Sequence, residues 1–201
     1  MERYETESLS AVLWERERAA KEKLEAGYDP VVMIRVVEWS GICWAYDRLS
    51  ESEGVSDPRH ELMGWMLVQD ALRDDESVRW RVHQDALGLI MDSFGVQDWH
   101  RSDRTVSYDW PNKDVLAERY AACRNECADD DERYMWRSVE RALCALSDHG
   151  ARTLSLAGDL GLPADLTRIF VSWLHVETLQ YRPGTFTYDV LDKAHGEACR
   201  C

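Results

Sequence analysis

Hydrophobic residues recur at three- and four-residue spacing along most of the chain, which is the pattern of amphipathic helices. The first such segment covers residues 8–26. Its apolar stripe is formed by Leu9, Val12, Leu13, Ala20 and Leu24. Charged residues of both signs fill the rest of its surface, so the pattern predicts a helix that lies on the outside of the protein.

The stretch 31–49 has a different pattern, because it shows no consistent polar face. Arg35, Glu38 and Asp47 point in scattered directions at 100° per residue. A helix that is apolar nearly all round is usually buried. We therefore expect residues 30–49 to form a central buried helix. The residues expected in the core are Ile34, Val37, Ile42 and Trp44.

Aspartate–proline pairs at Asp29-Pro30 and Asp57-Pro58 indicate where two helices begin. Aspartate caps free backbone N–H groups, and proline suits the first helical turn. The periodicity also predicts helices after Glu76, Asn112 and Glu132, and near 153–160 and 163–180. Gly95 is a candidate stop for the helix that precedes it.

Together these segments predict an all-α protein, a compact single domain over residues 1–201 with about eight helices around 30–49. A sub-unit boundary is predicted near 95–112, between N-terminal helices in 1–95 and C-terminal helices in 112–201. Two short segments, 105–109 and 185–189, alternate in the manner of strands. They either pair as a minor two-stranded β ribbon or form two unrelated turns.

Charge restricts the partners of this protein more than any motif does. Thirty-eight acidic residues stand against twenty-four basic ones, a net charge of −14. Acids outnumber bases by thirteen to seven in residues 1–57 and by six to five in 151–201. This balance disfavours free nucleic acid and anionic membrane and favours a basic protein surface. The alternative is that the acids serve only solubility.

The first seven residues contain no apolar run of the kind found in a signal peptide. The longest apolar stretch, 31–49, contains four charged residues, which argues against a membrane span. The sequence therefore predicts a cytoplasmic protein, and its six cysteines are expected to be reduced.

The segment 95–112 is the strongest candidate for a specific contact. It combines aromatic and basic residues typical of binding hot spots with little helical periodicity. The residues concerned are Trp99, Arg101, Arg104, Tyr108 and Trp110. Alternatively, the tryptophans only pin the loop onto the domain.

Two groups of soft ligands are weak candidates for a metal site. Cys123 and Cys127 lie one helical turn apart, and His195, Cys199 and Cys201 lie close together in the chain. Zinc would require the two groups to meet. The alternative is two small buried residues and an incidental tail, and we expect no metal and no cofactor, since no cofactor motif is present.

The predicted function is a non-enzymatic protein-binding module that docks on a basic or nucleic-acid-binding surface of a partner. Acidic inhibitors of phages and mobile elements that mimic nucleic acid fit this charge as a class. The acidic faces 2–25 and 126–140 and the loop 98–110 would make contact. The acidic residues assigned to the contact are Glu126, Asp129, Asp130, Asp131 and Glu132. Two alternatives stay open: a helix–turn–helix-like transcription regulator using 153–180, and a small-molecule or metal-dependent enzyme.

Overall fold

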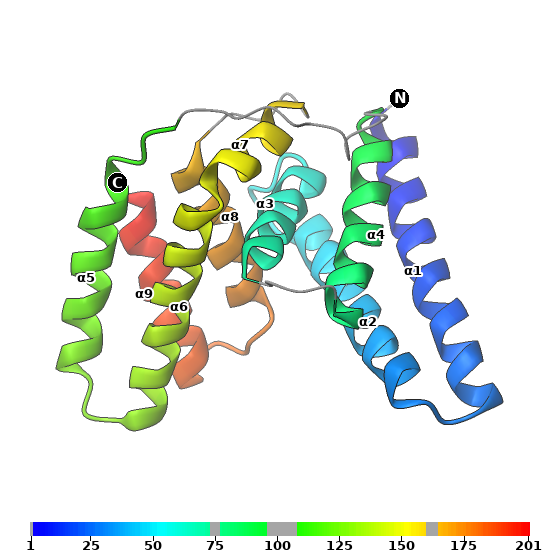
Figure 1. Ribbon diagram of the computed structural model, residues 1–201, viewed down its shortest axis with the longest axis horizontal. Coiled ribbons are helices and arrows are strands. Elements are labelled where there is room, and N and C mark those ends of the chain that lie inside the picture. Colours follow the sequence, from blue (N-terminus) through cyan, green and yellow to red (C-terminus); the bar gives the residue numbers. More distant parts are fainter. Residues whose placement is uncertain (1, 73–76, 96–107, 160–164) are drawn as a thin grey trace.

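The computed structural model describes residues 2–72, 77–95, 108–159 and 165–201, and within them it contains nine α-helices and no strand. The helices are α1 (Glu2–Ala26), α2 (Pro30–Glu51), α3 (Pro58–Ala71), α4 (Val78–Ser93), α5 (Asn112–Glu126), α6 (Asp130–Asp148), α7 (Gly150–Asp159), α8 (Leu166–Leu179) and α9 (Phe186–Cys199). Figure 1 shows their arrangement. The predicted all-α fold is confirmed.

Helix boundaries follow the local chemistry that the sequence indicated. Asp29 and Asp57 each accept a hydrogen bond from the backbone N–H two residues on, at 2.8 and 2.9 Å. A proline occupies the first turn in both cases. Gly95 follows the end of α4 with a φ of 75°, a conformation that glycine adopts without steric cost. These two starts and this stop are therefore confirmed.

A strand at 185–189, one of the two alternatives for this segment, is wrong, because these residues cap and begin helix α9. The Thr185 hydroxyl accepts the backbone N–H of Tyr188 at 3.3 Å and caps the helix. Further along α9, Val190, Leu191 and Ala194 are buried at helical spacing. The short alternation at the start of the segment was thus a helix cap and first turn, and the predicted β ribbon has no strand there. Its other half, 105–107, lies outside the described residues.

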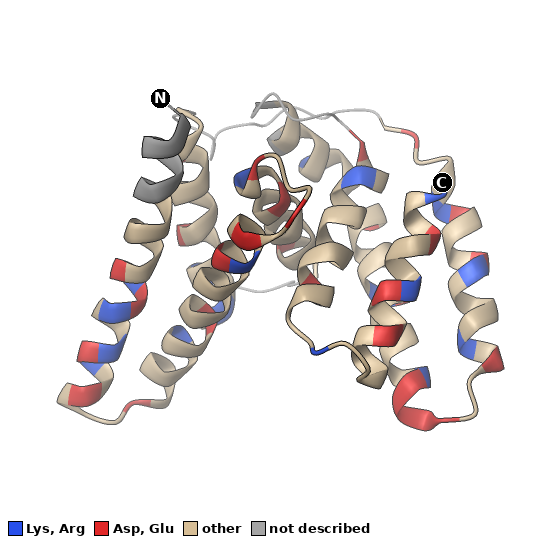
Figure 2. Cartoon of the chain, turned by 180° about the vertical axis from the view of Figure 1, so that it is seen from behind, with Lys and Arg blue, Asp and Glu red and all other residues tan. Residues whose placement is uncertain are grey.

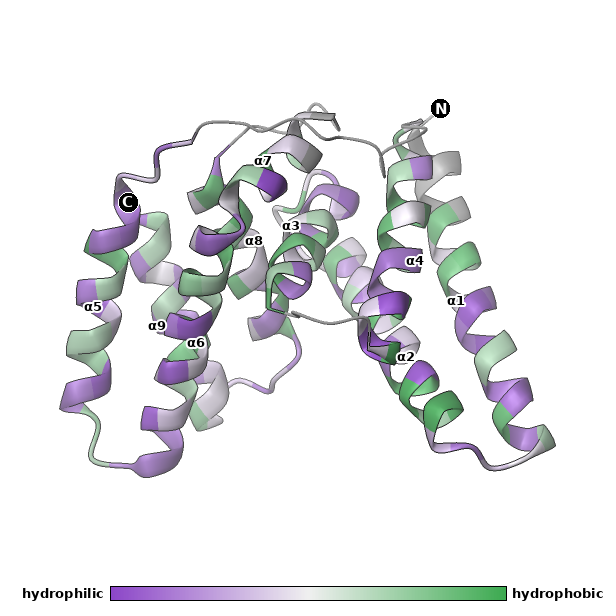
Figure 3. Cartoon of the chain, viewed as in Figure 1, coloured by the Kyte–Doolittle hydropathy of each residue, from purple (hydrophilic) through white to green (hydrophobic). Residues whose placement is uncertain are grey.

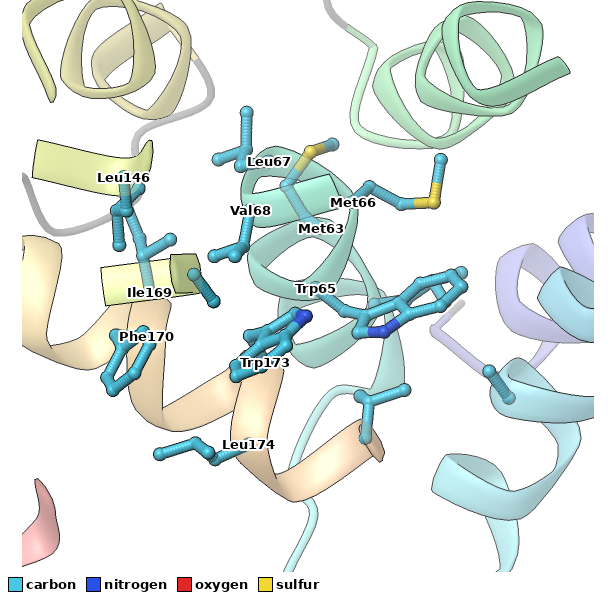
Figure 4. Close-up of a cluster of buried hydrophobic side chains, with 14 of the residues drawn as sticks. Met63, Trp65, Met66, Leu67, Val68, Leu146, Ile169, Phe170, Trp173 and Leu174 are labelled. Carbon is cyan, nitrogen blue, oxygen red and sulfur yellow. The ribbon is translucent and has the colours of Figure 1, made fainter. Parts of the chain in front are cut away.

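Helices α3 and α8 form the centre of the molecule, and each packs more extensively on the other than on any other helix. Figure 4 shows Val68 of α3 beside Ile169 of α8, and Trp65 of α3 beside Trp173 of α8. The two backbones approach closely at Gly64 of α3. A Cβ at that position would lie 2.6 Å from the Ser172 Cβ, so only glycine fits the contact without rearrangement.

Two arms diverge from this centre in Figure 1. One arm contains α1 and α2, with α4 packed on both. The other contains α5 and α6, with α9 packed on both. Buried apolar residues from all nine helices nevertheless join in one continuous cluster. Most of the predicted boundary at 95–112 lies outside the described residues, and α3 and α8, which come from the two sides of that boundary, are packed together.

The expectation that 30–49 forms the central buried helix needs correction. One side of α2 is buried, with Trp39, Ile42 and Tyr46 in the core. On the opposite side, Val37 is 58% exposed and Trp44 is 37% exposed. The reason is that α1 and α4 cover the flanks of α2, and no described helix covers its outer side. The helix buried nearly all round is α3.

Candidate protein-binding surfaces

The turn between α5 and α6 concentrates the acidic residues that the sequence assigned to a contact. We call it the acidic turn, and it comprises Glu126, Asp129, Asp130, Asp131 and Glu132. All but Glu132 are exposed, and Glu132 is half-buried. Figure 2 shows the group as a red segment at the end of the α5–α6 arm.

Helix α6 explains why these acids lie together. Asp129 caps the helix by accepting the N–H groups of Asp131 and Glu132 at 2.8 and 3.0 Å. Asp130, Asp131 and Glu132 occupy the first turn, where the helix dipole favours negative charge, and Glu126 is the last residue of α5. Within the described residues, Arg133 is the basic side chain that pairs with this group, through Asp130. The turn therefore keeps a strong local negative charge.

An aromatic residue accompanies the acids. Tyr134 follows the acidic turn on α6 and is 66% exposed. Exposed tyrosine supplies contact area at low conformational cost in binding surfaces. Charge and an aromatic side chain are therefore available in the same region.

The acids of α1 do not join the acidic turn. They lie on the other arm of the molecule, where Figure 2 shows α1 banded in red and blue. Basic residues are interspersed with them, for example Lys21, which pairs with Glu17. The acidic faces predicted at 2–25 and 126–140 are thus two separate surfaces.

Of the predicted contact loop, Trp99, Arg101 and Arg104 lie outside the described residues, whereas Tyr108 and Trp110 are held against the protein. The Tyr108 hydroxyl donates to the Ser147 carbonyl. The Tyr108 ring lies so close to Gly150 that a Cβ there would come within 2.5 Å of it. This contact fits the alternative in which the aromatic residues of the segment pin it down.

Trp110 is buried in the same way. Its Nε1 donates to the Thr167 hydroxyl at 2.9 Å, and its ring makes a T-shaped contact with Phe170 at a centroid distance of 6.2 Å. The Trp110 indole is therefore engaged in contacts within its own chain. Neither Tyr108 nor Trp110 joins the acidic turn in one surface.

Sequence reasoning missed a second exposed surface on α2. Met33, Val37, Gly41 and Trp44 recur every three or four residues and define what we call the outer face of α2. The Arg48 guanidinium lies over the Trp44 ring, 4.7 Å from its centroid. Figure 3 shows the first turns of α2 in green. The signal in the sequence was the missing polar face, which we interpreted as burial.

The weak metal candidates remain apart. The Cys127 thiol donates to the backbone carbonyl of Cys123 at 3.1 Å, and the Cys201 sulfur lies 3.4 Å from Nη1 of Arg119. All six cysteines are free. Within the described residues, no group of three or more histidine, cysteine, aspartate or glutamate side chains is arranged to hold a metal ion.

Four polar side chains form a row across α3, α8 and α9. Among the described residues, this row most resembles a catalytic site. Glu61 lies 3.8 Å from Nδ1 of His175, whose ring stacks on His195 at 5.7 Å, and Nε2 of His195 lies 3.6 Å from the Cys199 sulfur. Burial lowers the pKa of His195 and raises the pKa of Cys199. Both shifts favour the neutral thiol and neutral imidazole over the ion pair that thiol catalysis uses.

The helix–turn–helix hypothesis requires an accessible second helix, and α8 does not provide one. It is packed between α3 and α9. Arg168 is its one exposed side chain, while residues such as Ile169 and Trp173 are buried. A recognition helix must present several side chains to a groove of DNA. The corner itself, at 160–164, lies outside the described residues.

No described helix is long and apolar enough to span a membrane. Comparisons with models of protein families, with curated proteins and with solved structures found no match.

Proposed function

We propose that this protein is a non-enzymatic binding module that docks on a basic surface of a partner protein through the acidic turn. The observation that carries the proposal is the concentration of exposed carboxylates at the end of the α5–α6 arm. A surface of this kind attracts a basic partner from a distance and accelerates association. A nucleic-acid-binding groove is a basic surface of that type, and a module seated there would inhibit it.

The geometry favours the acidic turn over the other acids of the chain. In α1, cations alternate with the acids, and Lys21 neutralises Glu17. Among the described residues, mainly Arg133 offsets the negative charge of the acidic turn. Its position at the end of an arm also lets a partner approach without meeting α1. Tyr134 would then add apolar contact beside the charges.

The experiment is an affinity capture from host lysate across a salt series, with two variants that carry equal charge. The first variant combines Glu126→Gln, Asp130→Asn and Asp131→Asn in the acidic turn. The matched control combines Glu15→Gln, Glu22→Gln and Glu25→Gln, which are exposed positions of α1. Both variants lose three negative charges, so only the location of the loss differs between them.

We expect the wild-type protein and the α1 control to retain the same basic protein to similar salt concentrations. The acidic-turn variant should release it at markedly lower salt, because screening acts on the charges that remain. Equal release from both variants would assign binding to net charge rather than to the acidic turn. Retention of no basic protein at low salt would contradict the proposal itself.

A further inference from the structure

The outer face of α2 is an apolar helix surface left uncovered by the described chain. Met33, Val37 and Trp44 are 38%, 58% and 37% exposed. From Pro30 to Trp44 this face carries no charged side chain, because Arg35 and Glu38 point elsewhere around the helix. Contiguous exposed apolar surface on a protein of this size marks an interaction site.

Gly41 strengthens this inference. A glycine inside a helix costs about 0.5–1 kcal/mol relative to alanine. At Gly64 of α3 the packing of Ser172 explains this cost, because a side chain would not fit there. At Gly41, by contrast, a Cβ would meet no atom within 4 Å, so the fold of the single chain does not explain the glycine. A glycine on an outward-facing surface lets another helix approach closely. The uncovered face is therefore shaped for a partner helix.

The two acids that flank the middle of this face, Glu38 and Asp47, are both engaged by side chains of α1 or α4. Asp47 accepts hydrogen bonds from Ser10 and from Nε1 of Trp14, at 3.1 and 2.9 Å. On the other flank, Glu38 lies 2.9 Å from Nε2 of His83. Arg79 also pairs with Glu38, at 3.3 Å. In a chain of net charge −14, the middle of this face is therefore a surface on which two copies can meet without opposing acids, while the exposed Asp29 lies at its end.

We propose that two copies of this chain associate through the outer faces of α2, packed antiparallel about a two-fold axis between Val37 and Gly41. In this register Val37 of each copy packs on Gly41 of the other, and Trp44 packs near Ile34. Arg48 of each copy then reaches the exposed carboxylate of Asp29 at the start of α2 in the other. Antiparallel packing also brings each helix N-terminus beside a C-terminus, which the helix dipoles favour.

This inference goes beyond the proposed function and does not rest on it. The acidic turn lies on the other arm of the molecule, so a dimer formed through α2 leaves both acidic turns accessible. The complementary charges at Arg48 and Asp29 favour a second copy over a basic partner. A basic protein would find no acid along the face from Pro30 to Trp44.

The test is sedimentation velocity of the full chain from about 1 to about 100 µM, a range in which modest interfaces dissociate. The disrupting variants are Val37→Glu and Gly41→Gln. Gly41→Gln meets open space in the single chain and improves the helix propensity, so it does not threaten the fold. The matched control is Tyr134→Glu, which places the same charge at an exposed aromatic position on α6.

We expect the wild-type mass to rise from one chain to two with concentration, and Tyr134→Glu to behave alike. Val37→Glu and Gly41→Gln should raise the dimer Kd roughly tenfold or more. Arg48→Glu should also weaken the dimer, and unchanged affinity in that variant would overturn the antiparallel register. A wild-type protein that stays monomeric throughout, or dimerisation of both disrupting variants with unchanged affinity, would overturn the proposal.

Discussion

Helices α2 and α8 have similar sequences in one respect, since neither has a broad polar face, yet their surroundings are opposite. In α8, packing by α3 and α9 leaves Arg168 as the one exposed side chain. In α2, the outer face lies open although its residues are as apolar as many in the core. The comparison teaches that the hydrophobicity of a helix indicates how much of its surface is better buried than exposed to water. Hydrophobicity does not indicate which helix of the same chain, or which partner molecule, covers those apolar residues.

The same contrast appears in two helical glycines. Gly64 lies where α3 and α8 approach each other, and its missing side chain is required by Ser172. Gly41 lies on the outer face of α2 with free space around it. One glycine is explained by the fold of the single chain, and the other is explained by the dimer proposed above.

The largest effect is expected from removing an aromatic ring from α8. Phe170 is fully buried and lies between the rings of Trp110, Tyr120 and Trp173. Phe170→Ala should lower the free energy of unfolding by about 3–5 kcal/mol. On the outer face of α2, Trp44→Ala should cost about 1 kcal/mol, because its ring is partly in water and alanine favours the helix.

Urea unfolding at low protein concentration measures both values, with each variant compared with the wild type. Dilute protein keeps any dimer dissociated, so the measurement reports the single chain. A loss for Trp44→Ala as large as that for Phe170→Ala would remove the contrast between the two helices.

Alanine at the two glycines should have opposite effects. Gly64→Ala forces the Ser172 region to shift and should destabilise the protein by about 1–3 kcal/mol. Gly41→Ala meets open space and should stabilise the single chain by about 0.5–1 kcal/mol through its helix propensity. Thermal unfolding of dilute samples gives the signs directly. The same sign for both substitutions would show that Gly41 is constrained within its own chain.

Much of the fold followed from the sequence because local chemistry decides helix boundaries. Asp29, Asp57 and Gly95 act where they were predicted to act, since caps and stops depend on neighbours in the chain. Helix α9 was not predicted, because over five residues a helix cap followed by alternating residues resembles a strand. A wider window would have included Val190, Leu191 and Ala194 at helical spacing.

The candidate surfaces were harder to predict, because they depend on contacts between distant segments. The acidic turn could be recognised from consecutive acids, but its separation from α1 is set by the two diverging arms. Tyr108 and Trp110 have the composition of a hot spot and are held instead by Ser147 and Thr167, which lie far along the chain. The outer face of α2 is exposed because none of the described helices covers it, which periodicity does not reveal.

A smaller effect should appear in the pH dependence of stability, through the packing of α8 on α9. Burial, with His175 adding to it, lowers the pKa of His195 below 6.5 in the folded protein, while Asp192 and Glu61 oppose the shift. The unfolded state therefore binds more protons as the pH falls, and stability is lost below about pH 6.5. Wild-type protein should show this loss, and His195→Gln should reduce it.

Glu61 should act in a separate pH window. The hydrogen bond from His175 lowers the pKa of the Glu61 carboxyl below 4.5, so its contribution is present above pH 4.5 and is lost as the pH falls further. Unfolding of wild type, His195→Gln and Trp44→Ala from neutral to acid pH separates these effects. Trp44→Ala, on the outer face of α2, should keep the wild-type pH dependence. An unchanged slope near pH 6 in His195→Gln would contradict the assignment.

The most direct test of the central claim uses one substitution at two positions that differ in coverage. Val176 of α8 is fully buried, and Val37 of α2 is 58% exposed. Both are changed to alanine, and the free energy of unfolding is measured in dilute solution. Val176→Ala should lose about 2 kcal/mol, from two methyl groups and the cavity they leave. Val37→Ala should stay within about 0.5 kcal/mol of the wild type, since it loses little burial and gains helix propensity. Equal losses at the two positions would contradict the claim that α8 is covered by its own chain and the outer face of α2 is not.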